Sequence, residues 1–400
     1  MTGQNDKLLA VEGLRGVACF MVVLSHLSLI FYPYLHNFNA ADSTGYDIQN
    51  LIHHSPLTFF FSGSAAVYIF FVLSGYILTK VALRSQPSLS RISSMAIKRY
   101  PRLMLPALVS CLLAVAIFQF VGMPGSDMIH SINNYGDFDY SLTGAFYNGA
   151  IDTFFLSGQS LYNPVLWTMK VELLGSFIIY FLCMNKASFN IPFLCVISLV
   201  VLLALTGLKL VGTGLTAGLI AFYGGYYFCR YGRVISLKIA IPLLLTGLYL
   251  AGAHNGSSSY ALIESIVGQK TYILGNFLSG FFLVYAVIFN DRVNGLFSGK
   301  LPVFMGKVSF SVYLIHLPLL STLGFYLFEL SFGYSGSYHL SALSASLLTV
   351  AAVYVAAVYF YKYVDLTGMK ISNLFAKSVL GIFKPGVNAA QPKETVANNS

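Results

Sequence analysis

An arginine and a histidine lie eleven residues apart in the first apolar stretch of the chain, at Arg15 and His26. In a helix this separation is three turns plus about 20°, so both side chains project from one face, roughly 16 Å apart along the axis. Ionisable groups are costly inside a membrane helix, so they usually face the bundle interior and mark a functional pathway. A guanidinium can hold an anion and a neutral imidazole can accept a proton. The pair therefore predicts anion binding and proton transfer at two depths of one helix.

A second basic cluster, Lys98, Arg99 and Arg102, lies where another apolar segment begins. Two arginines three residues apart can clamp a phosphate through their fork-shaped donors. Ordinary cytoplasmic charge or contact with anionic lipids would explain the same residues. Arg15 alone could likewise neutralise Glu12 or extend to the lipid headgroups. These residues are candidates for holding an anionic, nucleotide-like ligand.

Further polar side chains are predicted to lie deeper in the bundle. Glu172 would lie about 12 Å into its segment by rise per residue. Lys170 is not on its helical face, so its partner should come from another helix. Tyr313 and His316 are three residues apart on one face. Trp167, the only tryptophan, suits either an interfacial anchor or a substrate contact.

The composition defines the elements that must position these groups. Hydrophobic residues make up 56% of the chain and charged residues only 9%, which predicts an all-α polytopic membrane protein. The net charge of +9 does not indicate nucleic-acid binding, because the basic residues occur in short loops between apolar segments. The five cysteines form no CxxC pair, and neither a P-loop nor a dinucleotide-binding glycine pattern occurs. We therefore expect no metal site, disulfide framework or nucleotide-binding domain of a soluble type.

About ten segments are long enough to span a bilayer. They are residues 10–32, 57–83, 100–122, 164–184, 189–208, 212–230, 234–253, 271–290, 303–329 and 339–364. With a cytoplasmic N-terminus, nearly all lysines and arginines fall in the inside loops, which follows the positive-inside rule. We therefore expect a bundle of about ten helices with both termini in the cytoplasm. It would form one transmembrane domain over residues 1–370, followed by a cytoplasmic tail over 371–400 that is disordered at its end.

One loop on the outer side, residues 123–163, is long enough to be functional. It contains no lysine or arginine and is rich in aromatic residues and aspartates. Aromatic rings beside acidic and amide groups suit stacking on sugar rings and hydrogen bonding to them. An interfacial aromatic belt with a short surface helix would produce the same composition.

Five elements together resemble a known family. They are residues 12–26, which contain the arginine and histidine eleven apart, and residues 70–76, 99–102, 166–172 and 306–316. In this order they are similar to the signatures of the integral-membrane acyltransferase 3 family, which includes O-antigen acetylases and other O-acetyltransferases of cell-surface glycans. The sequence departs from the pattern at Lys170 and Leu173, and it lacks the proline of the family's Glu-x-Pro element at residues 365–367.

The resemblance implies a multi-pass enzyme of the bacterial inner (plasma) membrane. It would move an acyl group, most often acetyl, from cytoplasmic acyl-CoA to a hydroxyl of an extracytoplasmic glycan such as O-antigen or exopolysaccharide, or of a lipid-linked sugar. It would hold no tightly bound cofactor, acetyl-CoA being a substrate, and its other neighbours would be membrane lipids. His26 is the implied catalytic residue, and Arg15, Arg99 and Arg102 are implied in handling the donor.

From the residues we add expected roles around that core. Lys98, Ser74 and Gly75 are candidates for the donor side, although a Ser-Gly step in an apolar helix more often marks tight packing. Glu172 could orient His26 or the acceptor as a second catalytic residue. On the acceptor side we expect Trp167, Tyr313 and His316, the last two as donors toward a developing oxyanion.

Other functions and reaction paths remain open from the sequence. The same buried arginine, histidine and glutamate could form a proton or substrate relay in a secondary transporter or flippase, although inverted repeats are not evident. A purely structural or lipid-binding component would leave the buried ionisable groups unexplained. For the enzyme, direct transfer and a covalent acyl-histidine intermediate both fit.

Overall fold

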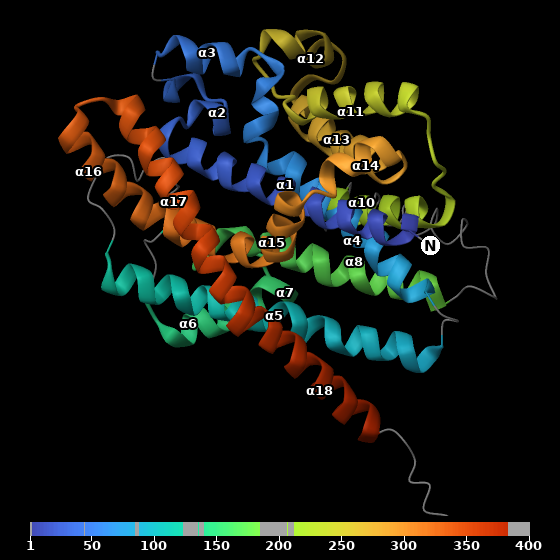
Figure 1. Ribbon diagram of the computed structural model, residues 1–400. Helices are drawn as coiled ribbons and strands as arrows, with labels where there is room; N and C mark the ends of the chain where they lie inside the picture. Colours follow the sequence, from blue (N-terminus) through green and yellow to red (C-terminus); the bar gives the residue numbers. More distant parts are fainter. Residues whose placement is uncertain are drawn as a thin grey trace, which may run out of the picture.

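The computed structural model describes residues 2–43, 45–84, 88–122, 135, 140–184, 206 and 212–382, with side chains from residue 8 onward. These residues form helices joined by short turns, and no β-strand occurs among them. The all-α prediction is confirmed (Figure 1). The expected segment 189–208 and the end of the tail, residues 383–400, lie outside the described part of the chain.

The longer helices form the body of the molecule. They are α1 (Thr2–Phe31), α4 (Gly63–Leu83), α5 (Leu89–Phe120), α8 (Trp167–Met184), α10 (Thr213–Tyr231), α11 (Leu237–Ala251), α13 (Thr271–Ile288), α15 (Lys300–Leu319), α16 (Phe325–Ser335), α17 (Tyr338–Phe360) and α18 (Leu366–Ile382). Shorter helices connect them, namely α2 (Tyr34–Asn37), α3 (Asp47–His53), α6 (Leu142–Tyr147), α7 (Thr153–Phe155), α12 (Ala261–Val267) and α14 (Asp291–Phe297). Turns of 3-10 or π-helix complete the path, among them η5 (Pro164–Leu166) and η9 (Tyr361–Asp365).

Seven helical segments of the described chain are long and apolar enough to cross a membrane. They are Leu8–Phe31, Gly63–Leu83, Leu89–Phe120, Pro164–Met184, Ser258–Ile288, Lys300–Ser335 and Tyr338–Gly381. Two more of the expected ten correspond to the helices α10 and α11, but α11 has only 15 residues, or about 22 Å, against a hydrocarbon core of about 30 Å. The count of ten and the cytoplasmic placement of the termini therefore stay predictions.

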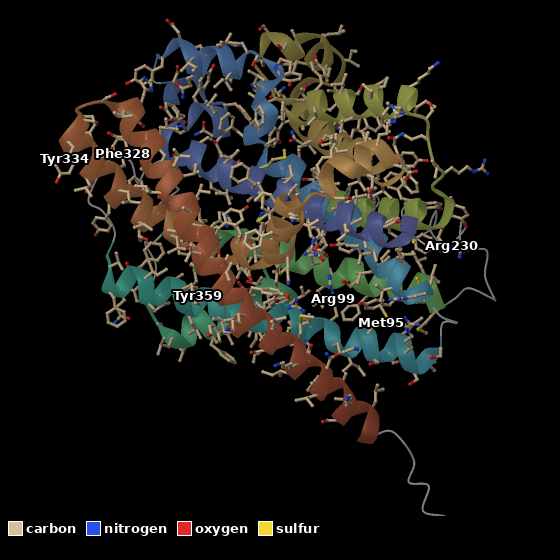
Figure 2. The ribbon with its side chains drawn as sticks, in the orientation of Figure 1. Met95, Arg99, Arg230, Phe328, Tyr334 and Tyr359 are labelled. Atoms are coloured by element: carbon tan, nitrogen blue, oxygen red, sulfur yellow. The ribbon has the colours of Figure 1, made fainter. Side chains whose placement is uncertain are left out.

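The surface of α17 shows why this bundle belongs in lipid. Leu343, Leu347, Val355 and Tyr359 are each more than half exposed along this helix, and Figure 2 shows Tyr359 on the outside of the bundle. A contiguous apolar face of this length would be unstable in water, whereas a bilayer solvates it. The protein is accordingly a membrane protein.

Helix α1 is central to the packing, and its contact with α15 is the most extensive between any two helices of the described chain (Figure 1). Glycines allow this approach. A Cβ atom added to Gly306 would lie 1.8 Å from the backbone oxygen of Glu12, and one added to Gly16 would lie 2.5 Å from the nitrogen of Gly306. Small residues at such crossings let two membrane helices pack backbone to backbone. The same contact aligns the polar residues further along α1 and α15.

A second close crossing joins α4 to α10. A Cβ atom on Gly75 would lie 2.2 Å from the backbone oxygen of Phe222, and one on Gly225 would lie 2.1 Å from that of Val72. The Ser-Gly step was interpreted either as part of the donor site or as a point of tight helix packing. Gly75 serves the packing. Its neighbour Ser74 faces a cavity instead.

The described part of the outer loop, residue 135 and residues 140–163, folds against the bundle. Figure 1 shows α6 beside α5, and contacts between these two helices agree, whereas α7 contacts α8 and packs its aromatic rings on Tyr100 of α5. Tyr135 and Phe154 are buried, while Phe146 and Phe155 are more than half exposed. Part of the aromatic content therefore builds the core, and the rest faces outward. At the other end of the chain, α18 runs through position 370 to Ile382, so residues 371–382 are helical.

Replacing Gly306 by alanine should separate α1 from α15, because its methyl group has no space against Glu12. Overpacking of this kind costs about 1–3 kcal/mol of folding free energy. We expect a lower thermal unfolding temperature for Gly306→Ala in detergent. Gly295→Ala is the control, since a Cβ atom there meets nothing within 4 Å. Equal stability of both variants would contradict the close crossing.

Candidate functional site

Two cavities lie along helix α1, and each contains one member of the Arg15–His26 pair. The arginine cavity, of about 200 Å³, is lined by Arg15, Arg99, Arg102, Ser74, Glu172 and mostly apolar side chains of α4, α8 and α15. The histidine cavity, of about 670 Å³, is lined by His26, His36, Ser25, Trp167 and side chains that include Tyr135, Gln159 and Tyr272. Arg15 and His26 thus line two different cavities along α1, in agreement with the separation expected from their spacing.

Arg99 and Glu172 form the central ion pair of the arginine cavity. The Arg99 Nη2 atom lies 2.7 Å from Glu172 Oε2, and the Ser74 hydroxyl donates to Glu172 Oε1 at 2.8 Å. Arg99 Nε also donates to the Ser176 hydroxyl at 2.6 Å. Figure 2 shows Arg99 inside the bundle, between α5 and α8. The network joins α4, α5 and α8, and it leaves neither buried charge without a partner.

The position of Glu172 differs from one expectation and agrees with another. Its partner does come from another helix, as its isolation from Lys170 predicted. However, the carboxylate lies in the arginine cavity, paired with Arg99, and not beside His26. The depth estimate along α8 was insufficient to choose between the two cavities, because the tilt and position of α5 decide which polar group the carboxylate meets.

Arg102 is held by a residue that the sequence pattern did not mark as a partner. Its guanidinium forms an ion pair with Asp365, which is almost fully buried in the π-helical turn η9 between α17 and α18. The guanidinium also lies 5.7 Å from the centre of the Phe310 ring. Asp365 lies where the family's Glu-x-Pro element is missing. Its negative charge was the signal in the sequence that could have identified it as the partner of Arg102. The pair ties α5 to the C-terminal helices.

Arg15 has the loosest contact of the three arginines. It pairs with Glu12 at 3.4 Å, and both side chains are about one-third exposed. Such a pair contributes little to stability. The lining contains three guanidiniums and one carboxylate, and two further carboxylates, Glu12 and Asp365, pair with Arg15 and Arg102 from beside it. Lys98 is not among the described residues that line this cavity.

In the histidine cavity, His26 contacts His316 of α15 directly. His26 Nδ1 lies 3.0 Å from His316 Nε2 and 3.1 Å from the carbonyl oxygen of Val22. His316 Nδ1 lies 3.0 Å from the carbonyl oxygen of Val312. His316 is fully buried, whereas His26 is partly exposed toward the cavity.

These contacts determine where the protons of the two neutral rings reside. A carbonyl oxygen only accepts, so His316 Nδ1 carries a hydrogen and donates it to Val312. His316 Nε2 is then an acceptor, and the hydrogen that His26 Nδ1 carries is shared between it and the carbonyl oxygen of Val22. The remaining ring nitrogen, His26 Nε2, is consequently unprotonated. The structure thus provides an oriented imidazole base at the edge of the larger cavity.

A third histidine, His36, joins this group. After Pro33 the chain turns back, and the His36 ring lies 5.8 Å from that of His26. His36 Nδ1 donates to the Ser25 carbonyl at 2.8 Å and lies 3.0 Å from its hydroxyl oxygen. Burial lowers the pKa of His36, so the ring is neutral at pH 7. Sequence analysis missed His36; the available signal was a histidine soon after a helix-ending proline.

The remaining residues that we expected to bind the acceptor substrate lie in different places. Trp167 lines the histidine cavity. The hydroxyl group of Tyr313 donates to the backbone oxygen of Val165 at 2.7 Å and lies 3.0 Å from the Thr168 hydroxyl. That hydrogen is therefore engaged within the protein, while the Tyr313 ring borders both cavities.

Comparison with known proteins agrees with this site. Residues 8–361 match the family model described as an acyltransferase domain, which is nearly the whole described chain. The chain belongs to this acyltransferase family. It is also similar to the O-acetyltransferase PaAT-1 of Phomopsis amygdali, with 22% identity over 429 aligned positions that cover 91% of this chain and 83% of that protein. No solved structure matches the chain.

Removing one member of the Arg99–Glu172 pair should cost more than removing both. Glu172→Leu leaves a largely buried guanidinium without its carboxylate, at a cost of about 3 kcal/mol of folding free energy. Adding Arg99→Met should recover part of that loss, which thermal unfolding in detergent measures. Lys98→Met in the same background is the control and should recover none. If the losses of folding free energy from Arg99→Met and Glu172→Leu add in the double variant, the two side chains are not coupled.

Proposed function

We propose that this acyltransferase moves a short acyl group, acetyl above all, from acyl-CoA to a hydroxyl group of a glycan. The observation that carries the proposal is the hydrogen-bonded pair His26–His316, which leaves His26 Nε2 as a base in a large cavity beside an arginine-lined one. Membership of the family supports acyl transfer. The O-acetyltransferase activity named for the fungal relative supports a hydroxyl acceptor and an acetyl donor.

In the proposed reaction His26 acts as a general base. Its Nε2 takes the proton of the acceptor hydroxyl as that oxygen attacks the thioester carbonyl. The bond between carbonyl carbon and sulfur then breaks, and the leaving thiolate of CoA takes the proton back from the imidazolium. His316 accepts a hydrogen bond from His26 Nδ1 throughout, which fixes the ring orientation and stabilises the charge that forms on it.

The donor is proposed to bind at the arginine cavity. Guanidinium groups of Arg15, Arg99 and Arg102 suit phosphate oxygens. The cavity volume of about 200 Å³ is smaller than the ~300–1,000 Å³ of pockets that enclose a whole drug-sized ligand. We therefore place the slender thioester arm and its nearest phosphate there, with the nucleotide beyond the cavity. In this arrangement Glu172 holds Arg99 in position and is not a proton carrier.

The acceptor is proposed to enter the histidine cavity. Its lining includes aromatic rings and amide or hydroxyl groups, namely Trp167, Tyr272, Gln159 and Ser160. Rings of this kind stack on sugars, and the polar groups can hydrogen-bond to sugar hydroxyls. From the loop charges of the sequence we propose that this cavity faces the outer side and the arginine cavity faces the cytoplasm. This orientation would carry an acyl group across the plasma membrane to an extracytoplasmic glycan.

Loss of the base should abolish transfer. We expect His26→Ala to reduce acylation by about 10²–10⁴-fold, the usual contribution of a general base. The assay incubates membranes containing the protein with radiolabelled acetyl-CoA and the host's extracted surface polysaccharide, and it counts label in the glycan. His53→Ala, which changes a histidine of α3 outside both cavities, is the control. Full transfer by His26→Ala would refute the proposal, and solute uptake without glycan labelling would favour a transporter.

Two substitutions of His316 distinguish its role in orienting His26 from its role in packing. His316→Gln retains a side-chain acceptor for His26 Nδ1, whereas His316→Leu fills similar space without one. We expect His316→Leu to lower kcat about 10–100-fold, the range found when a group that hydrogen-bonds to a functional histidine and orients it is removed. His316→Gln should restore part of the lost kcat. The pH profile of kcat should shift in His316→Leu. Equal activities and profiles in both variants would contradict an orienting role.

A further inference from the structure

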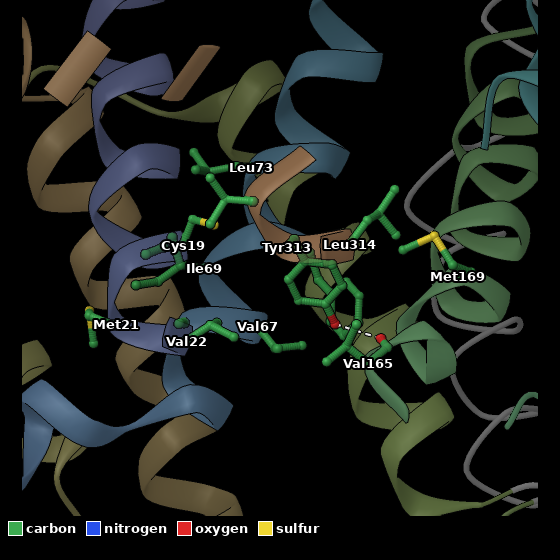
Figure 3. Packing of buried hydrophobic residues seen from close by; sticks show 14 of the residues in the cluster. Cys19, Met21, Val22, Val67, Ile69, Leu73, Val165, Met169, Tyr313 and Leu314 are labelled. Carbon is green, nitrogen blue, oxygen red and sulfur yellow. Dashed lines mark hydrogen bonds between the residues drawn. The ribbon is translucent and has the colours of Figure 1, made fainter. Parts of the chain in front are cut away.

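The two cavities have a common wall. Among the described residues, Val67 of α4 and Tyr313 of α15 line both the arginine cavity and the histidine cavity. Both side chains are 7% exposed. Figure 3 shows the Val67 side chain directed from its helix toward the Tyr313 ring. A group that crosses from one cavity to the other at this wall meets both side chains.

Hydrogen bonds from the start of α8 hold the tyrosine side of this wall. The Tyr313 hydroxyl donates to the Val165 carbonyl at 2.7 Å, the bond drawn in Figure 3, and Thr168 Oγ1 lies 3.0 Å away. Val165 lines the histidine cavity and Thr168 lines the arginine cavity, so the ring is clamped at their boundary. The Phe70 ring supports it, with ring centres 6.2 Å apart.

The valine side of the wall is also stiff. Val67 is β-branched, and in a helix such a side chain has one strongly preferred rotamer. Its helix α4 packs against α1, α8, α10 and α13, which leaves the backbone little room to retreat. Interiors packed in this way respond to even one additional methylene group. The space between Val67 and Tyr313 therefore has a defined width.

We propose that Val67 and Tyr313 form the passage through which the donor presents its acyl group to His26, and that the space between them limits the width of that group. This inference rests on the proposed function. The thioester arm lies on the arginine side, and the base lies on the histidine side. The carbonyl carbon must therefore come to the wall, and the alkyl chain of the acyl group has to fit between the valine and the tyrosine ring. Acetyl passes, and acyl groups that branch next to the carbonyl meet the two side chains.

Shortening Val67 tests this passage. The assay compares acetyl-CoA and isobutyryl-CoA as donors to the same surface polysaccharide and reports the ratio of their kcat/KM values. We expect Val67→Ala to raise the isobutyryl-to-acetyl ratio about 10–200-fold, the effect of roughly one methylene group in an apolar site. Val72→Ala is the matched control, because Val72 is buried on the same helix and lines neither cavity. Its ratio should equal that of the wild type.

A second variant covers the case in which Val67→Ala does not fold. Tyr313→Phe retains the ring but removes its bond to Val165, so the ring can move aside and the isobutyryl-to-acetyl ratio should again rise. Unchanged ratios in the folded variants, with a wild type that transfers acetyl, would overturn the size limit alone. A wild type that transfers no acyl group from either donor would overturn the proposed function instead.

Discussion

The close crossing of α1 and α15 is the constraint on which the rest of the site depends. Inside a bilayer the hydrophobic effect gives little reason for one apolar helix to prefer another over lipid, so packing and hydrogen bonds decide the contact. Gly16 and Gly306 let the two backbones approach to a distance that no larger residue permits. Further along the same interface, this approach brings His26 within 3.0 Å of His316. A wider crossing would leave His316 Nε2 without its partner in an apolar interior.

The ionisable groups of the arginine cavity follow the same logic. Two of its three guanidiniums, both largely removed from solvent, meet a carboxylate from another segment, Arg99 with Glu172 and Arg102 with Asp365. Buried pairs of this kind seldom increase stability over apolar residues, because removal of both charges from water costs as much as the pairing returns. Their retention here is consistent with a functional use. They also join α5 to α8 and to the turn before α18, so the cavity wall and its charge form one unit.

Much of this arrangement could be predicted from residue types and spacing. The all-α membrane class followed from composition, and the placement of Arg15 and His26 in separate regions followed from helical rise. The family was recognisable from five short elements in order, and residues 8–361 match its model. The crossing of α4 with α10 at Gly75 was one of two readings open in the sequence. In each case the property depends on a single helix or on local residue type.

The sequence by itself therefore determined the class, the family and the residues that carry charge. Only the tertiary structure decided which of those residues meet: Glu172 with Arg99 and not with His26, Asp365 with Arg102, and His316 with His26. It also decided that Val67 and Tyr313 border both cavities. The physical reason is that depth along a helix follows from counting residues. Its rotation, tilt and neighbours depend on packing between segments far apart in the chain.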